Sequence, residues 1–476
     1  MFPKNRGLKA KAAVAVLGTL FFAAALVFAQ GNPTLSEFTL TLTGDSMLMT
    51  PPSMRQNDPG FMGVVKAVRQ GDAAFTNIEE MYASSKSYPA ATSGNTYMAA
   101  DPSMLKELQW IGFNLFGAVN NHSYDYGLQG VLDTLANLKA NGAVYAGIGE
   151  TLGEAREPHY LATPHGRVAI LATTSTFLEA APASDPRPDL RGRPGINPLH
   201  YSTVYNVDAA SFAALKKVND DLQLGGPGRG NQQTVTFPES TDPFGKNARI
   251  VFQQSDKPGV VTTADPSDVA EISRYIKDAK QMANYVVVSI HAHEGLSGPQ
   301  GNAKPAQFLE QFAHAAVDAG ADVFAGHGPQ QLRGIEIYKG SVIFYSLGGL
   351  FYQDNIVRVE PSDFYKRYNL GPDARPSEGY DARGGALAGT SGSLDEPHNE
   401  SVVAKVIFKD RKPVQVVLTP ITISVDRRPD YGIPRLADPA MANKILEYLQ
   451  KLSQPYGTNI VIKDGIGTIA VDQSRR

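Results

Sequence analysis

The sequence predicts an α/β fold built around a parallel sheet. Short apolar runs with the alternation of strands are followed by amphipathic stretches with the spacing of helices, and this order repeats along residues 38–146. Strands are expected at 38–43, 73–78, 113–119 and 143–146, and helices at 61–70, 102–112 and 128–140. Because parallel strands need a long crossover, usually a helix, this order predicts βαβ units.

The same alternation returns in the second half of the chain. Helices are expected at 266–282 and 305–319, and strands follow them at 285–290 and 322–325. Further strands are expected at 160–162, 168–173, 335–338, 342–345, 402–408 and 414–419, and a helix at 439–452. We therefore expect one domain over residues 35–430, with residues 431–476 as a C-terminal helix and tail packed on it.

Two segments interrupt this alternation. Residues 178–262 are rich in proline and glycine, and one helix is expected there, near residues 208–222. We interpret this segment as an insertion over the core, of the kind that forms lids and binding loops. Residues 360–400 are expected to be a loop.

The composition excludes several classes of protein. Hydrophobic residues make up 42% of the 476 residues and charged residues 19%, which is typical of a globular protein and excludes wholesale disorder. The net charge of −3 argues against a nucleic-acid binder, which normally carries a basic excess. The chain has no cysteine, so any metal must be held by His, Asp, Glu or Asn.

The N-terminus is typical of an export signal. Residues 1–11 carry four basic side chains and no acid, residues 12–29 are uncharged and apolar, and small residues stand before Gln30. This pattern predicts a secretory signal peptide over residues 1–29. The alternative is an uncleaved membrane anchor at 12–29, because the run approaches the length of a spanning helix. Both interpretations predict an exported protein, in the periplasm, at the cell surface or secreted.

Polar residues that suit metal or acid–base chemistry follow five of the expected strands. They are Asp45, Asn77 with Glu79, Asn120 with Asn121 and His122, His291 with His293 and Glu294, and His327. Each alone would be an ordinary turn or helix cap, but ligands of open α/β sheets bind beyond the carboxyl ends of the strands. Imidazole and carboxylate groups suit divalent metals, and a histidine beside them can move a proton. The set therefore predicts a metal site or an acid–base site at one end of the sheet.

A series of short motifs in a fixed order carries a resemblance to a known family. The motifs are GD at 44–45, FTNIE at 75–79, VNNHSYDYG at 119–127, HAHE at 291–294, GHGP at 326–329, RGIEIYKG at 333–340 and IFYSLG at 343–348. In their order and spacing over residues 38–352, the chain resembles the CapA family, the poly-γ-glutamate capsule biosynthesis proteins. That family belongs to the calcineurin-like metallophosphatase superfamily.

The resemblance implies a four-layer αββα sandwich, with two sheets face to face, helices outside and the site at the strand ends. It implies one or two divalent ions, either Mn, Zn, Fe or Mg, whose ligands would be Asp45, Glu79, Asn121, His291 and His327. His122 would be the general acid or base, and Asp125 would orient it. The residues that line a second metal position or bind substrate would be Asn77, His293, Glu294 and Arg333.

Three positions depart from the family pattern. Asp45 is followed by Ser46 and Met47, whereas the superfamily phosphatases have the motif DxH. Gln330 stands where much of the family has histidine, and Gly349 stands where the family usually has asparagine. Because two of these departures remove histidine ligands, the sequence leaves open whether the site holds two ions, one ion or none.

Three functions fit these observations. The first is an exported metal-dependent hydrolase that cleaves a phosphoester or an amide in a cell-envelope polymer such as poly-γ-glutamate. The second is a non-catalytic component that exports or anchors this polyanion with other capsule-synthesis membrane proteins. The third is a metal-independent acid–base enzyme such as an epimerase. A polyanion binder needs basic residues at the mouth of the site, and the candidates are Arg191, Arg193, Arg333 and Lys339. The set of polar residues at the strand ends is retained but incomplete, and this favours the first two functions.

Overall fold

The structure is a computed structural model. It describes residues 37–473, apart from 84–85, 95, 224–233, 239–248, 297–302, 387–397 and 426–429. The expected signal segment, residues 1–29, lies outside the described residues. Within the described ranges, every helix is too short or too polar to cross a membrane.

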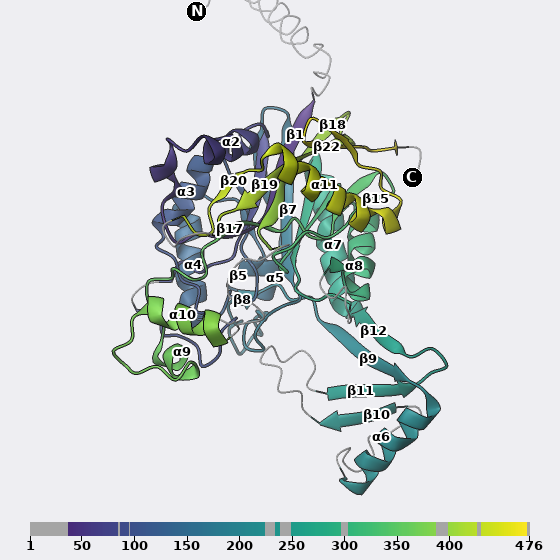
Figure 1. Ribbon diagram of the computed structural model, residues 1–476. Helices are drawn as coiled ribbons and strands as arrows, with labels where there is room; N and C mark the ends of the chain where they lie inside the picture. Colours follow the sequence, from purple (N-terminus) through teal and green to yellow (C-terminus); the bar gives the residue numbers. More distant parts are fainter. Residues whose placement is uncertain are drawn as a thin grey trace, which may run out of the picture.

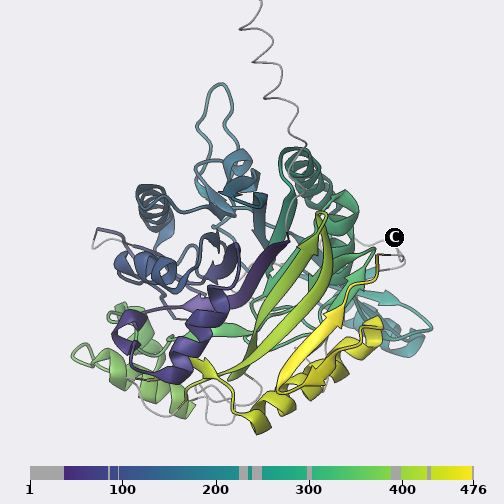
Figure 2. The same cartoon turned by 90° about the horizontal axis from the view of Figure 1, so that it is seen from above.

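Two β-sheets face each other at the centre of the molecule (Figures 1 and 2). The larger sheet has the order β21-β22-β19-β18-β1-β2-β3-β4, with β17 beside β1 and β20 beside β19. Its strands are β1 (Phe38–Met47), β2 (Ala73–Ile78), β3 (Leu115–Gly117), β4 (Tyr145–Ala146), β17 (Gly349–Tyr352), β18 (Glu400–Lys409), β19 (Lys412–Ile423), β20 (Pro434–Leu436), β21 (Val461–Lys463) and β22 (Ile466–Ala470). The smaller sheet has the order β15-β16-β14-β13-β7-β6. Its strands are β6 (His159–Thr163), β7 (Gly166–Thr174), β13 (Tyr285–His291), β14 (Val323–His327), β15 (Ile335–Tyr338) and β16 (Ser341–Phe344).

The strands that lead into the polar motifs run parallel within each sheet. In the larger sheet β1, β2 and β3 are parallel neighbours, and Asp45 is level with Asn77 where the register of β1 and β2 shifts. In the smaller sheet β13 is parallel to β7 and β14, and His291 is level with His327. The carboxyl ends of both sheets therefore carry their polar side chains to the same end of the sandwich.

Apolar side chains from both sheets fill the space between them. Leu40 and Phe75 of the larger sheet pack in one buried cluster with Ile170 and Val287 of the smaller sheet. The C-terminal helix α11 (Pro439–Ser453) adds leucine and isoleucine side chains to the same cluster.

Helices cover the outer face of each sheet. On the larger sheet lie α2 (Pro59–Val68), α3 (Ser103–Ile111) and α4 (Gly127–Ala140). On the smaller sheet lie α7 (Pro266–Met282) and α8 (Gln307–Ala319). The order helix, sheet, sheet, helix confirms the expected αββα sandwich.

Three of these helices begin with the same dipeptide, Asp-Pro, at residues 58–59, 265–266 and 438–439. In each, the aspartate carboxylate accepts two backbone N–H groups of the first turn, which have no partner inside the helix. Proline suits the first helical position because it lacks an N–H that would otherwise be unpaired.

The two segments expected to be irregular contain regular structure. In the insertion a separate sheet has the order β10-β11-β9-β12 and lies beside α6 (Ala209–Asp221). Its strands are β9 (Tyr201–Val207), β10 (Thr234–Pro238), β11 (Arg249–Gln254) and β12 (Gly259–Ala264). Residues 360–400 contain α9 (Ser362–Arg367) and α10 (Pro376–Ala386). Figure 1 shows both additions at the lower end of the sandwich, where β1 finishes.

The expected helix is present as α6, but the four strands of the insertion were not expected. Strands β9 and β12 bury few side chains completely, so their apolar alternation is weak. The short elements of the core are η1 (Pro52–Arg55), β5 (Ile148–Gly149), α5 (Leu152–Arg156), β8 (Gly195–Ile196) and η3 (Gln454–Tyr456).

Candidate metal centre

Three buried side chains from two different sheets meet at the carboxyl end of the sandwich. Asp45 Oδ1, from β1, lies 3.3 Å from His291 Nδ1 of β13 and 2.8 Å from His327 Nδ1 of β14. The two Nδ1 atoms are 3.2 Å apart. The structure thus brings one carboxylate and two imidazoles together, each with a ligand atom facing the same point.

The spacing of these three atoms suits the ligands of one ion. Ligand atoms that lie roughly 2.1 Å from a divalent metal are about 3.0–3.4 Å apart at octahedral or tetrahedral angles. Ser289 Oγ lies 2.8 Å from His327 Nε2, so the Nε2–H can donate to this hydroxyl and leave Nδ1 free as a ligand.

A second cluster shares His291 with the first and contains Glu79 and His293. His291 Nε2 lies 3.0 Å from His293 Nε2 and 3.7 Å from Glu79 Oε1. The two clusters therefore use opposite nitrogens of one imidazole ring.

Burial and neighbouring charges affect the two carboxyl groups in opposite directions. Burial alone would raise the pKa of Asp45, but the imidazoles of His327 and His291 hold it well below its usual range. Burial raises the pKa of Glu79 well above its usual range, and the charge of Asp45 raises it further. Without a cation, Asp45 therefore loses its proton more readily than Glu79, and a bound divalent cation would favour ionisation of Glu79.

Several acceptor atoms at the centre are buried without a hydrogen-bond donor among the described residues. They are Asn77 Oδ1, Glu79 Oε1, Asn121 Oδ1, Gln330 Oε1 and Asp354 Oδ1. Such atoms are rare, because a buried polar group without a partner costs about 1–3 kcal/mol. All five are oxygens, the ligand atoms that hard divalent cations prefer. The donor set of this end of the sandwich therefore fits a divalent metal.

His122 lies on the loop that follows β3, and Asp125 holds its ring. His122 Nδ1 is 2.6 Å from Asp125 Oδ2. The Asp125 carboxylate also accepts the backbone N–H groups of Gly94, at 2.8 Å, and Met98, at 2.9 Å. With Nδ1 bound to Asp125, the opposite nitrogen is the one that can exchange a proton with a substrate.

The other expected residues have separate roles in the structure. Asn77 Nδ2 donates to Asp45 Oδ1 at 2.8 Å, and Asn121 Nδ2 donates to the carbonyl of Gly94 at 3.1 Å. Asn77 thus fixes the carboxylate of the first cluster, while the amide oxygen of Asn121 is buried without a donor among the described residues.

Glu294 and Arg333 lie outside both clusters. Glu294 accepts the hydroxyls of Ser175, at 2.7 Å, and Thr176, at 3.0 Å. Arg333 is fully buried and donates to the backbone carbonyls of residues 292–293 at 3.3 and 3.1 Å. Its guanidinium therefore supports the segment that carries His293.

Two further charged residues reach the centre, and the sequence analysis missed them. Arg383 of α10 donates to Asp354 Oδ2 at 2.9 Å, and both side chains are buried. Burial raises the pKa of Asp354, and Arg383 and His122 oppose this effect, so Asp354 lies within electrostatic reach of His122. Asp354 follows β17, so the strand-end rule would have found it if this strand had been recognised. Arg383 lies in an expected loop, and no signal in the sequence pointed to it.

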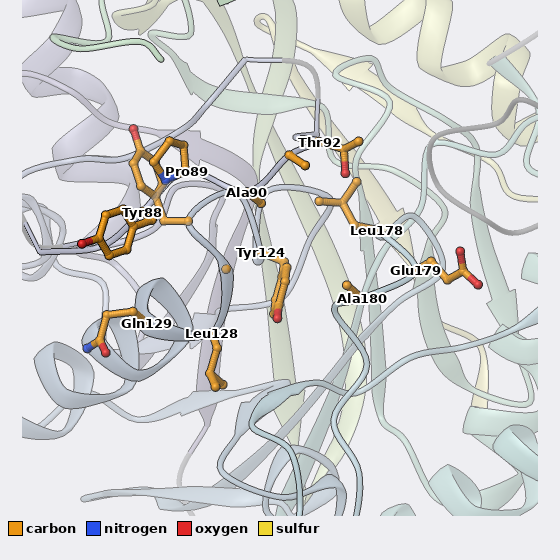
Figure 3. A pocket seen from close by; sticks show the side chains of 13 residues that line it. Tyr88, Pro89, Ala90, Thr92, Tyr124, Leu128, Gln129, Leu178, Glu179 and Ala180 are labelled. Carbon is orange, nitrogen blue, oxygen red and sulfur yellow. The ribbon is translucent and has the colours of Figure 1, made fainter. Parts of the chain in front are cut away.

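A cavity of about 730 Å³ lies beside the loop that carries His122 (Figure 3). Its lining comes from residues 88–92, 124, 126–129 and 178–180, and it includes Glu179 but no lysine or arginine. The N–H of Ala90 donates to the carbonyl of Asp125 at 2.8 Å, so the wall of the cavity and the His122 loop are joined.

Comparison with known proteins identifies the family. Residues 39–354, about two-thirds of the chain, match the model of the bacterial capsule synthesis protein family PGA_cap. The chain belongs to this family. The match confirms the resemblance to the CapA proteins and to the metallophosphatase-like superfamily, and it spans every candidate residue of the centre except Arg383.

Individual relatives include two capsule or PGA biosynthesis proteins and one uncharacterized protein. The chain is 34% identical to the uncharacterized protein y4sH of Sinorhizobium fredii, over 91% of this chain and 93% of y4sH. It is 25% identical to the capsule biosynthesis protein CapA of Bacillus anthracis, over 68% of this chain and 62% of CapA. It is 26% identical to the PGA biosynthesis protein CapA of Bacillus subtilis, over 64% of this chain and 60% of that protein.

Proposed function

We propose that this capsule synthesis family member is an exported, divalent-metal-dependent hydrolase that acts on a polyanionic cell-envelope polymer. The observation that carries the proposal is the Asp45–His291–His327 cluster with the Asp125-bound His122 beside it. The CapA relatives support the choice of polymer, because the one from Bacillus subtilis is a PGA biosynthesis protein.

The residues of the centre have distinct tasks in this proposal. Asp45, His291 and His327 would hold the cation, and Asn121 offers a further oxygen ligand. A bound divalent cation would polarise the phosphoryl or carbonyl oxygen of the substrate and make a water molecule more acidic.

His122 would act on the leaving group. The water oxygen bonds to phosphorus or to the carbonyl carbon, the bond to the leaving oxygen or nitrogen breaks, and His122 donates a proton to that atom. Asp125 keeps the ring in the orientation that this transfer needs. The attacking water loses one proton, and one proton returns to His122, so the net reaction adds one water across the cleaved bond.

The charged residues around the centre also favour binding of a polyanion through a metal ion over binding through basic side chains. The cavity lining has no lysine or arginine, and Arg333 is fully buried rather than at the mouth of the site. Lys339 pairs with Asp318 at 2.5 Å. Arg191 and Arg193, the other two basic candidates, are exposed, so they stay candidates for binding a polyanion at the surface. At the buried centre itself a polyanion would need the cation for charge complementarity, which favours the hydrolase there.

The test measures metal and turnover on the same purified protein. Metal content is determined by mass spectrometry, and hydrolysis of poly-γ-glutamate and of a phosphodiester is followed with and without Mn²⁺ or Zn²⁺. We expect turnover that EDTA abolishes. His327→Ala should lose both metal and turnover, whereas the matched variant His314→Ala should keep both, because His314 pairs with Glu336 away from the centre. Absence of metal and turnover in the wild type would refute the proposal.

The export of the protein needs its own test. The chain is expressed in a bacterium, and the fractions outside the cytoplasm are collected. N-terminal sequencing of the mature protein should begin near Gln30 if residues 1–29 are a cleaved signal. Recovery of the chain in the cytoplasm alone would contradict this part of the proposal.

A further inference from the structure

We propose that the centre holds a single divalent ion, because the side-chain amide of Gln330 occupies the position that a second ion would take. This inference rests on the proposed function only in requiring that one ion binds at the Asp45–His291–His327 cluster. It concerns the number of ions and the residues that limit it.

Gln330 bridges the two carboxyl groups of the centre. Its Nε2 donates to Glu79 Oε2 at 2.6 Å and to Asp45 Oδ2 at 3.3 Å. Asp45 Oδ2 also accepts the backbone N–H of Gly328 at 2.7 Å. A second ion that shared Asp45 with the first would need these same oxygens of Asp45 and Glu79. An amide nitrogen has hydrogens to donate and no lone pair for a metal. With Nε2 bonded to both carboxyl groups, Gln330 therefore fills this position, and the amide would have to turn before its Oε1 could serve as a ligand there.

The backbone of Gln330 has a conformation that is unfavourable for a residue with a side chain. Gln330 has a backbone φ of 57°, in the left-handed region, and its Oε1 is buried without a donor among the described residues. A residue other than glycine in such a conformation costs roughly 1–3 kcal/mol and persists only where its surroundings hold it. In this conformation Nε2 of Gln330 reaches the carboxyl groups of Glu79 and Asp45.

Gly349 provides the space for the amide. A Cβ built on Gly349 would lie 3.0 Å from Gln330 Oε1, which is closer than side-chain atoms normally approach. A side chain at position 349 would therefore require the amide of Gln330 to shift from its bridging position.

The Glu79–His291–His293 cluster is the other candidate position for a second ion, and it competes with the first cluster for His291. The Glu79–His291–His293 cluster uses Nε2 of His291, whereas the first cluster uses Nδ1 of the same ring. A neutral imidazole has one nitrogen with a free lone pair, and the other carries the hydrogen. One neutral His291 can therefore serve one cluster at a time, and each route to a second ion is closed.

The test counts ions bound per chain. The full-length protein is dialysed to equilibrium against Mn²⁺, and bound manganese and protein are quantified in the same sample. We expect one ion in the wild type and two in Gln330→His, because imidazole replaces the blocking amide by a nitrogen ligand between Asp45 and Glu79. Two nearby Mn²⁺ ions also give a spin-coupled electron paramagnetic resonance spectrum, which a single ion does not. The matched control Gln254→His, on the exposed end of β11, should stay at one ion.

The possible outcomes separate this inference from the proposed function. Two ions in the wild type would overturn the single-ion inference and leave the hydrolase proposal standing. No ion in the wild type would overturn both. One ion in the wild type and one in a folded Gln330→His variant would overturn the role of Gln330. If that variant does not fold, Gln330→Ala is used instead, because it removes the amide without adding a ligand. We expect this variant to bind a second ion more weakly, at millimolar Mn²⁺. A count that stays at one ion would again overturn the role of Gln330.

Discussion

Replacement of Asp125 by asparagine tests how the loop that carries His122 is held. The Asp125 carboxylate is fully buried and accepts three hydrogen bonds, from His122 Nδ1 and from the N–H groups of Gly94 and Met98. An amide has one oxygen and one NH₂ group. In either orientation its NH₂ faces at least one of the two backbone N–H groups, which then loses its acceptor.

The structure sets the size of the expected effect. A hydrogen bond to a charged group contributes about 1.5–3 kcal/mol, and a buried donor left without a partner costs about 1–3 kcal/mol. We therefore expect Asp125→Asn to lower the free energy of unfolding by about 3–5 kcal/mol. This is a large part of the stability of an ordinary protein, which is about 5–15 kcal/mol.

Urea unfolding at pH 7 measures this loss. The matched control is Asp278→Asn on the exposed face of α7, where the carboxylate lies 3.7 Å from Arg274 and a change of less than about 0.5 kcal/mol is expected. Hydrolysis by Asp125→Asn should also slow at unchanged metal content, because the His122 ring loses its orientation. A stability equal to that of the control would refute the hydrogen-bond reasoning.

Three further predictions concern single positions. His122→Ala should lower the rate of hydrolysis by about 10²–10⁴ while metal content stays the same, and an unchanged rate would show that the acid is another residue. Burial raises the pKa of Glu360 to about 8 in the folded protein, so the folded state binds the proton more tightly than the unfolded state, where the pKa is near 4.5. The stability should therefore fall by up to a few kcal/mol as the pH rises from about 4.5 to about 8, and Glu360→Gln should flatten this dependence in urea titrations; equal slopes would contradict the shift. Gly44→Ala should destabilise the fold by roughly 3 kcal/mol or more, because a Cβ at Gly44 would lie 1.7 Å from the carbonyl oxygen of Gly348. A melting temperature equal to that of the wild type would show that these two backbones are not in contact.

The core of the fold could be predicted because its elements are apolar and regularly spaced. The strand at Ala73–Ile78 and the helix at Pro266–Met282 lie where the sequence predicts them. Helix α10 could not be found in this way, because its sequence contains three glycines and has little amphipathic character. Its contacts are tertiary: Arg383 pairs with Asp354, and Tyr380 donates to Glu360 at 3.0 Å. Such contacts have no periodic signature in the sequence.

The sequence predicts which residues belong to the candidate site, but it does not predict which of their atoms contact one another. Asp45, His291 and His327 were expected together because parallel strands carry their carboxyl ends to one edge, and the structure brings them within hydrogen-bonding distance. The sequence does not show which nitrogen of His291 faces which cluster. It also does not show that Gln330 reaches Glu79, because this depends on the backbone angle at position 330.

The contact between Gln330 and Gly349 also couples changes at these two positions during evolution. A Cβ at position 349 would lie 3.0 Å from Gln330 Oε1, so a side chain there would require the amide to shift. A substitution at position 349 therefore alters the surroundings of the residue at position 330, and we expect the two positions to change together among relatives of this chain.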